Sequence, residues 1–244
     1  MYQVSATPDR SLTELSVCLV GINYAPETTG IAPYTTALAS ALHTAGAAVH
    51  VVTGVPHYPQ WRVQDERYQR GLRWEEQLDG VWVSRRRHAV PARPGLGGRS
   101  LMEASFFAQS GLATAVDRSD VVIAVTPSLG GAMGAICGSR GRPVGVLVQD
   151  LTGNAAVESS TTGGKAGILI AKMEYQLLRR AALVGVVTPH FGKVLVRYGV
   201  DEAKVVSLPN FTHPARWMLR EPTLVAGWVG RSTGSRWYTP ATWG

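Results

Sequence analysis

Apolar and polar residues along the chain follow two alternating spacings. Leu15 to Ile22 is an almost unbroken apolar run, which is typical of a strand buried on both faces of a parallel sheet. After the next turn, apolar residues recur instead at the spacing of one helix face: Tyr34, Ala37, Leu38, Ala41 and Leu42. A second apolar run at residues 47–53 follows closely, so this part of the chain predicts a right-handed strand–helix–strand unit.

The same alternation continues as far as Leu208. Strands are predicted at residues 81–84, 120–126, 143–149, 183–188 and 204–208, and helices at 101–116, from 128 onward, at 170–181 and at 189–198. The helix that opens at Ser128 contains mostly small residues, so we expect it to approach the sheet closely. Strands that alternate with helices predict an α/β fold, a Rossmann-like doubly wound parallel sheet.

The turn at residues 21–34 is the best candidate for a ligand-binding loop. It is polar, and Gly30 within it can adopt a positive φ and let a ligand come close to the backbone. Free backbone N–H groups at the start of the following helix would face this turn, which favours an anion such as a phosphate. A glycine that serves only the geometry of the turn remains the alternative.

A second loop, residues 54–62, follows the second strand. Pro56 and Pro59 favour an extended backbone there. Aromatic residues occur in and after this loop: Trp61, Tyr68 and Trp74. These rings either stack against a sugar or pack down as loop anchors, and the sequence leaves both interpretations open.

Charge points to an anionic partner. The formal net charge is +7, and Arg85, Arg86 and Arg87 begin a region that has no acidic residue before Glu103. The run is either an ordinary solvated face or a patch that meets a lipid diphosphate or an anionic membrane leaflet. Nucleic acid is not expected, because the region lacks interleaved aromatics, zinc-finger spacing and an RNP-like motif.

Cysteine usage and hydropathy bear on the redox state, the metal content and the location of the protein. Cys18 and Cys137 have neither CxxC spacing nor a neighbouring histidine cluster, so both are predicted to be buried, reduced thiols, and no metal is expected. Residues 1–14 lack the apolar core of a signal peptide, and no run is long enough to span a membrane. A cytoplasmic location is expected, with peripheral contact at the inner face of the membrane.

Several of these segments resemble one family. Asn23-Tyr24-Ala25-Pro26-Glu27, Thr29-Gly30-Ile31 and Tyr34-Thr35 resemble the opening of the colanic-acid type of retaining glycosyltransferase, the WcaI-like branch of glycosyltransferase family 4. Pro56 to Trp61, Gln149-Asp150 and Pro209-Asn210 are similar to further segments of that family. The resemblance covers about residues 15–213, and it implies that this part is one half of the two-domain GT-B architecture.

The resemblance also implies roles for single residues. Thr29 and Gly30 would contact the donor phosphate, and the acceptor would meet Tyr34, His57 and Tyr58. Asp150 would be catalytic, orienting an acceptor hydroxyl or stabilising positive charge at the sugar carbon, although it could instead cap a following turn.

The same resemblance implies the reactants. A nucleotide sugar would be the donor substrate and a lipid-linked saccharide the acceptor, with no tightly bound cofactor and no metal. Gly153-Asn154 departs from the family pattern and leaves the acceptor's identity open.

The chain divides into three parts. Residues 1–14 are a polar tail, 15–213 the Rossmann-like domain and 214–244 an irregular tail. Read one base earlier, the codons of Trp237 to Gly244 allow Val-Val-Tyr-Ser-Gly-Asn-Met-Gly, which looks like the start of the family's second domain. A frameshift near Pro222 that truncates the protein and removes most of the nucleotide pocket is therefore expected, with coincidence as the alternative.

Three other function classes compete with this interpretation. A non-catalytic binder of lipid-linked glycan, or of a partner chain, fits the same features and remains open. A dinucleotide-dependent oxidoreductase is disfavoured, because no G-x-G-x-x-G follows the first strand. A serine hydrolase is disfavoured because no G-x-S-x-G is present.

Overall fold

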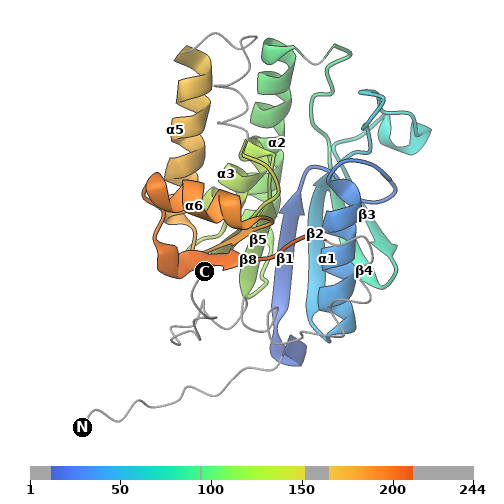
Figure 1. Ribbon diagram of the computed structural model, residues 1–244. Coiled ribbons are helices and arrows are strands. Elements are labelled where there is room, and N and C mark those ends of the chain that lie inside the picture. The colour runs from blue at the N-terminus through green and yellow to red at the C-terminus, as the bar shows by residue number, and fades with distance from the viewer. Residues whose placement is uncertain (1–11, 94, 152–164, 211–244) are drawn as a thin grey trace.

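The computed structural model describes residues 12–93, 95–151 and 165–210. Strands and helices alternate as the apolar pattern predicts (Figure 1). The strands are β1 (Ser16–Gly21), β2 (Ala48–Gly54), β3 (Arg73–Leu78), β4 (Val81–Arg86), β5 (Val121–Val125), β6 (Val144–Val148), β7 (Leu183–Val186) and β8 (Val205–Ser207). The helices are α1 (Ala32–Thr44), α2 (Leu96–Val116), α3 (Leu129–Gly138), α5 (Lys165–Arg180) and α6 (Pro189–Arg197), with short 3-10 turns at Leu12–Glu14, Glu66–Tyr68 and Glu202–Lys204.

The strands form one sheet in the order β3-β4-β2-β1-β5-β6-β7-β8. All neighbours pair in parallel except β3 and β4, which are antiparallel. The predicted α/β, doubly wound sheet is confirmed. The sequence pattern missed β3 because this edge strand has no buried side chain and alternates only between exposed and half-buried positions.

Each face of the sheet carries its own core. Side chains of β1 alternate between them, so that Val17 and Leu19 pack with α1 while Cys18 and Val20 pack with α2, α3 and α5. Both faces of β1 and β5 are therefore buried, which explains their unbroken apolar sequences.

The small residues of α3 allow a close contact with α2. A Cβ added to Gly134 would lie 2.2 Å from Ser110 Oγ, and one added to Gly138 would lie 2.4 Å from the carbonyl oxygen of Gly111. We predicted that these residues would bring the helix close to the sheet. The closest approach is to α2 instead, because the glycines of α3 have no side chain to separate the two helix backbones.

Some predictions fall outside the described residues. These are most of the tail at 1–14, the Gly153-Asn154 departure and the tail at 214–244. In the described part of the chain, no helix combines the length and the apolar character needed to cross a bilayer.

Candidate active site at the carboxyl edge of the sheet

Two loops lie at the carboxyl ends of adjacent parallel strands. The first follows β1 and covers residues 22–31, and the second follows β2 and covers residues 55–65. In open α/β sheets, ligands bind beyond this edge. The tertiary structure thus brings both predicted loops to one place (Figure 1).

Hydrogen bonds to its backbone hold the first loop in place. The amide of Ala25 donates to Thr36 Oγ1 at 2.9 Å, and its carbonyl accepts from Arg85 Nη2 at 2.5 Å. Thr29 and Gly30 at the tip are exposed, and Gly30 has a φ of +63°. Tyr34 lies half-buried in the first turn of α1, and no side chain caps that helix start. The predicted donor-phosphate residues are therefore accessible.

Glu27 joins the first loop to the second. One of its carboxylate oxygens, Oε1, accepts from the backbone N–H groups of His57 and Tyr58, each at 2.7 Å. The other, Oε2, accepts from Asn23 Nδ2 at 2.8 Å. The carboxylate is buried, so these three donors replace the water it loses. Glu27 therefore sets the position of one loop relative to the other.

The buried side chain of His57 packs beneath the backbone of the second loop, on the side facing the protein interior. Its ring is buried, and its Nδ1 lies 3.0 Å from the carbonyl oxygen of Val55. It packs edge-on against His88, with ring centroids 4.7 Å apart. His57 is predicted to contact the acceptor, but its ring is buried in this conformation, which argues against a direct contact.

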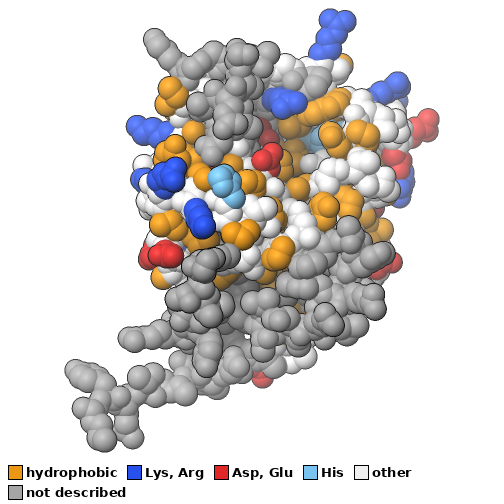
Figure 2. Space-filling model, viewed as in Figure 1, with side chains coloured by type: hydrophobic (Ala, Val, Ile, Leu, Met, Phe, Trp, Pro, Cys, Tyr) orange, Lys and Arg blue, Asp and Glu red, His pale blue; other side chains and the backbone are white. Residues whose placement is uncertain are grey.

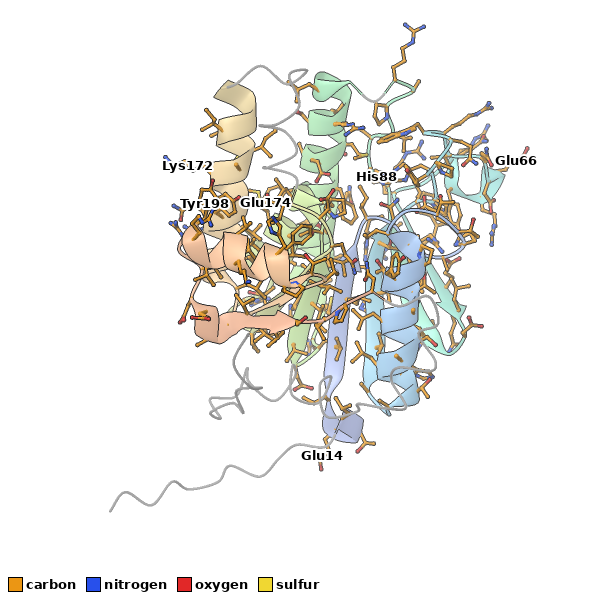
Figure 3. The ribbon with its side chains drawn as sticks, viewed as in Figure 1. Glu14, Glu66, His88, Lys172, Glu174 and Tyr198 are labelled. Atoms are coloured by element: carbon orange, nitrogen blue, oxygen red, sulfur yellow. The ribbon has the colours of Figure 1, made fainter. Side chains whose placement is uncertain are left out.

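His88 was not anticipated from the sequence. It lies among the loops of this edge (Figure 3) and packs against Phe106, with ring centroids 5.8 Å apart. Burial, followed by the neighbouring His57, lowers the pKa of His88 to about 3. The ring is therefore neutral at physiological pH and acts as a packing element.

Aromatic rings in and after the second loop occupy two different environments. Tyr68 is buried and packs edge-on against Trp74 at 5.4 Å, so these two rings are anchors. Trp61 is half-buried, has a φ of 52° and lies beneath the guanidinium of Arg99, whose Cζ is 5.5 Å from the ring centroid. A bulky residue rarely adopts a positive φ, which marks Trp61 as held by its surroundings.

Asp150 follows β6 at the same edge and is exposed. Its Oδ1 accepts from the backbone N–H of Leu151 at 2.8 Å, which is the local turn contact named as the alternative to catalysis. Gln149 beside it accepts from Asn210 Nδ2 at 2.6 Å, which ties the segment after β8 to this edge.

The arginine run does not form the predicted surface patch. Arg85 is buried, with 1% of its side chain exposed, and its Nε donates to Glu76. Its Cζ lies 5.4 Å from the ring centroid of Tyr68, whose hydroxyl also donates to Glu76. Arg85 supports the first loop from inside and cannot meet a membrane.

Arg86 and Arg87 are also engaged within the protein. Arg86 Nη2 lies 3.5 Å from Glu75 Oε1, and burial lowers the pKa of its guanidinium. Arg87 Nη1 donates to the carbonyl oxygens of Tyr68, Gln69 and Gly71. The run therefore organises the β3–β4 hairpin and the loop before it. The antiparallel partner β3, absent from the sequence prediction, supplies the carboxylates.

The structure confirms one of the two cysteine predictions. Cys18 is a free, buried thiol, whereas Cys137 is exposed rather than buried. Adjacent strands and the end of α2 bring the Cys18 thiol within 4.8 Å of ligand atoms of His50 and Asp117, a set that could hold a metal ion.

Contacts within that cluster disfavour a metal. Burial raises the pKa of the Cys18 thiol, which favours its protonated form over the thiolate that binds metals. Asp117 already accepts from Arg142 Nη1 at 3.0 Å and lies 2.7 Å from His50 Nδ1. Burial opposes ionisation of Asp117, but bonds from His50 and Ser119 outweigh it and lower the pKa of this carboxyl. The cluster is better explained as an ion-pair network.

Glu27 is the functional residue that sequence reasoning overlooked. It is the only acidic residue between Glu14 and Asp65, inside a loop already singled out for binding. A lone carboxylate in such a stretch indicates a specific set of donors. Two of its three donors, His57 and Tyr58, lie about 30 residues away, and the pairing of β1 with β2 brings them near.

Residues 29–210 match the family described as Glycosyl transferase 4-like domain. The chain belongs to this glycosyltransferase family. Its sequence is also 30% identical over 216 residues to a protein of Escherichia coli (strain K12) named as a colanic acid biosynthesis glycosyl transferase, WcaI. That alignment covers 83% of this glycosyltransferase chain and 52% of the relative, so the chain spans about half the length of the curated relative.

Solved structures share the fold of this glycosyltransferase domain. Sucrose-phosphate synthase from Thermosynechococcus elongatus has a TM-score of 0.58 at 15% identity, covering 84% of this chain and 52% of that one. The catalytic domain of starch synthase IV from Arabidopsis thaliana has a TM-score of 0.55 at 12% identity, covering 80% and 51%. Each match covers about half of the solved protein, as expected for one Rossmann-like half of a GT-B architecture.

Gly30 offers a direct test of the loop geometry. A Cβ at this position would lie 3.0 Å from Tyr58 Cε1 and would sit on a left-handed backbone. We expect Gly30→Ala to lower the free energy of unfolding by about 1–2 kcal/mol, as measured by urea denaturation. Gly97→Ala is the matched control, because a Cβ there meets nothing within 4 Å. Equal losses in the two variants would contradict the close contact between the loops.

Proposed function

We propose that this domain is the acceptor side of a retaining glycosyltransferase that moves a sugar from a nucleotide donor to a lipid-linked saccharide. The observation that carries the proposal is the family match across residues 29–210, which includes Gly30 and Tyr58 from both loops. The relative's role in colanic acid biosynthesis, as its name states, supports a saccharide acceptor.

The proposed reaction exchanges one bond at the anomeric carbon. The bond to the donor's diphosphate oxygen breaks, and its electron pair leaves with the diphosphate. The acceptor oxygen bonds to the same carbon on the same face, and its proton passes to the departing diphosphate. Positioning of the two reactants and stabilisation of the leaving charge would supply most of the rate.

Residues at the carboxyl edge receive roles in this proposal. Thr29 and Gly30 lie exposed at the loop tip, where backbone groups can meet the donor phosphate. Tyr58 and Tyr34 are half-buried and offer ring and hydroxyl to the acceptor. Asp150 is exposed beyond β6 and would orient an acceptor hydroxyl or stabilise positive charge at the sugar carbon. Glu27 acts on both loops as a positioning residue.

The proposal includes the reactants and the location. The nucleotide sugar is a substrate, and no tightly bound cofactor or metal takes part. The protein would work in the cytoplasm, in peripheral contact with the inner face of an anionic membrane. We assign acceptor binding to the domain of residues 29–210, with little transferase activity from this domain by itself.

Binding titrations of the chain test this assignment. A detergent-solubilised lipid-linked oligosaccharide is expected to bind saturably, and Tyr58→Ala to weaken that binding about tenfold, a loss typical of an aromatic contact. Glu202→Gln, at an exposed position in the turn before β8, is the control and should bind as the wild type does. UDP- and GDP-hexoses are expected to bind more weakly than micromolar. Micromolar nucleotide-sugar binding, or a Tyr58→Ala variant with wild-type affinity, would contradict the proposal.

A further inference from the structure

The start of α2 carries exposed aliphatic and basic side chains together. Leu96 is 52% exposed and Leu101 is 62% exposed, although large aliphatic side chains are usually buried. Arg93 and Arg99 on the same short stretch are also exposed. Arg99 lies over Trp61, so this surface adjoins the second loop of the candidate site.

The start of α5 has the same composition. Ile168 is 60% exposed and Leu169 is 59% exposed. Lys172 follows one turn later, is exposed and points outward from the helix (Figure 3). Its aliphatic stem can lie along an apolar surface while its ammonium group stays in water.

Both helices begin at the edge of the sheet that holds the candidate site. α2 follows β4 and α5 follows β6 in the chain, and each helix returns toward the amino ends of the parallel strands. Their first turns therefore lie at the same end of the molecule (Figure 1). Basic side chains project at that end and along the side in the space-filling view, among exposed hydrophobic ones (Figure 2).

The exposed charged residues of α2 and α5 are all basic. The acidic residues within α2 and α5 are Glu103 and Glu174. Glu103 accepts from Ser128 Oγ and the backbone N–H of Gly130 at the start of α3, and Glu174 is buried. A surface that combines exposed aliphatics with cations alone complements an anionic lipid leaflet.

We propose that the first turns of α2 and α5, with Arg93 before α2, form a docking surface for an anionic membrane. The aliphatic side chains enter the boundary between head groups and acyl chains, and the basic ones pair with lipid phosphates. This surface replaces the run at Arg85, whose side chain is buried. This inference deepens the proposed function, because docking would present a lipid-linked acceptor beside the loops. The link between docking and such an acceptor rests on the proposed function, whereas the docking surface itself does not.

Vesicle co-sedimentation of the full chain, without donor or acceptor, tests the docking surface. The wild type is expected to bind phosphatidylcholine vesicles containing about one third phosphatidylglycerol, and to bind pure phosphatidylcholine far less. Arg93→Gln with Arg99→Gln is expected to weaken binding to the anionic vesicles about thirty-fold. Leu96→Ser with Leu101→Ser is expected to weaken it about tenfold.

Leu112→Ser with Arg118→Gln is the matched control. These residues are also exposed and lie in the last turns of α2 or just beyond it. At a rise of about 1.5 Å per residue, Leu112 is roughly 16 Å from Leu101 and roughly 24 Å from Leu96. Both separations exceed the screening length of about 10 Å in ordinary buffer, so the control should bind as the wild type does.

Three results would overturn the proposal. The wild type could fail to sediment with anionic vesicles, or the control could lose as much binding as the variants at the start of α2. Sedimentation velocity could also show self-association that the variants at the start of α2 abolish, which would assign the surface to a second copy of the chain. None of these results bears on acceptor binding in detergent, so the proposed acceptor binding and the docking surface fail separately.

Discussion

Replacing Glu27 with alanine is expected to destabilise the domain by about 3 kcal/mol, because three buried donors would lose their acceptor. Urea unfolding followed by circular dichroism measures this loss. Glu27→Gln keeps one acceptor oxygen for the His57 and Tyr58 amides but turns an NH2 group toward Asn23. Its expected cost is therefore smaller, about 1–2 kcal/mol.

Glu66→Ala is the control for a carboxylate at the surface. Glu66 is exposed and lies on the outer side of the second loop (Figure 3). Its replacement is expected to change the free energy of unfolding by no more than about 0.5 kcal/mol. If Glu27→Ala unfolded at the same urea concentration as this control, the joining of the two loops by Glu27 would be refuted.

Arg85→Met is expected to cost about 3 kcal/mol, at the lower end of the range for breaking a buried ion pair. The variant leaves Glu76 without its cation and the carbonyl of Ala25 without its donor. Glu76 retains 21% of its side-chain exposure, so water offsets part of the loss. The same urea measurement applies.

Two further variants separate a structural role of Arg85 from a surface role. Arg99→Met removes an exposed guanidinium and should leave the free energy of unfolding within about 0.5 kcal/mol of the wild type. Arg85→Met combined with Glu76→Met replaces both charges with apolar groups and should cost less than Arg85→Met alone. A stable Arg85→Met variant that lost vesicle binding would restore the original patch interpretation.

Most elements could be predicted because their burial is regular. Strands β1 and β5 are buried on both faces, so their unbroken apolar sequences already indicate their environment. The helix α1 was predicted, but its buried face is shifted: of the predicted apolar positions only Leu42 is buried, together with Ala32, Thr35 and Ala39. β3 could not be predicted, because its alternation separates only exposed from half-buried positions. An edge strand that contributes little to the core leaves little trace in its apolar pattern.

The candidate site was predicted in part. Thr29, Gly30 and Tyr58 come together at the carboxyl edge, since parallel strands place their following loops side by side. The burial of His57 and the role of Glu27 were missed, because both depend on contacts between residues about 30 positions apart.

Local sequence by itself determined the alternation of strands and helices, the polar loop after β1 and the excess of positive charge, because each is a property of neighbouring residues. Only the tertiary structure decided which charges are free. The antiparallel register of β3 on β4 places Glu75 opposite Ser84 and Glu76 opposite Val83, within reach of Arg86 and Arg85. Arg93 and Arg99 lie outside this hairpin and are exposed. Ionic pairing depends on distance in space, which the order of residues in a chain does not specify.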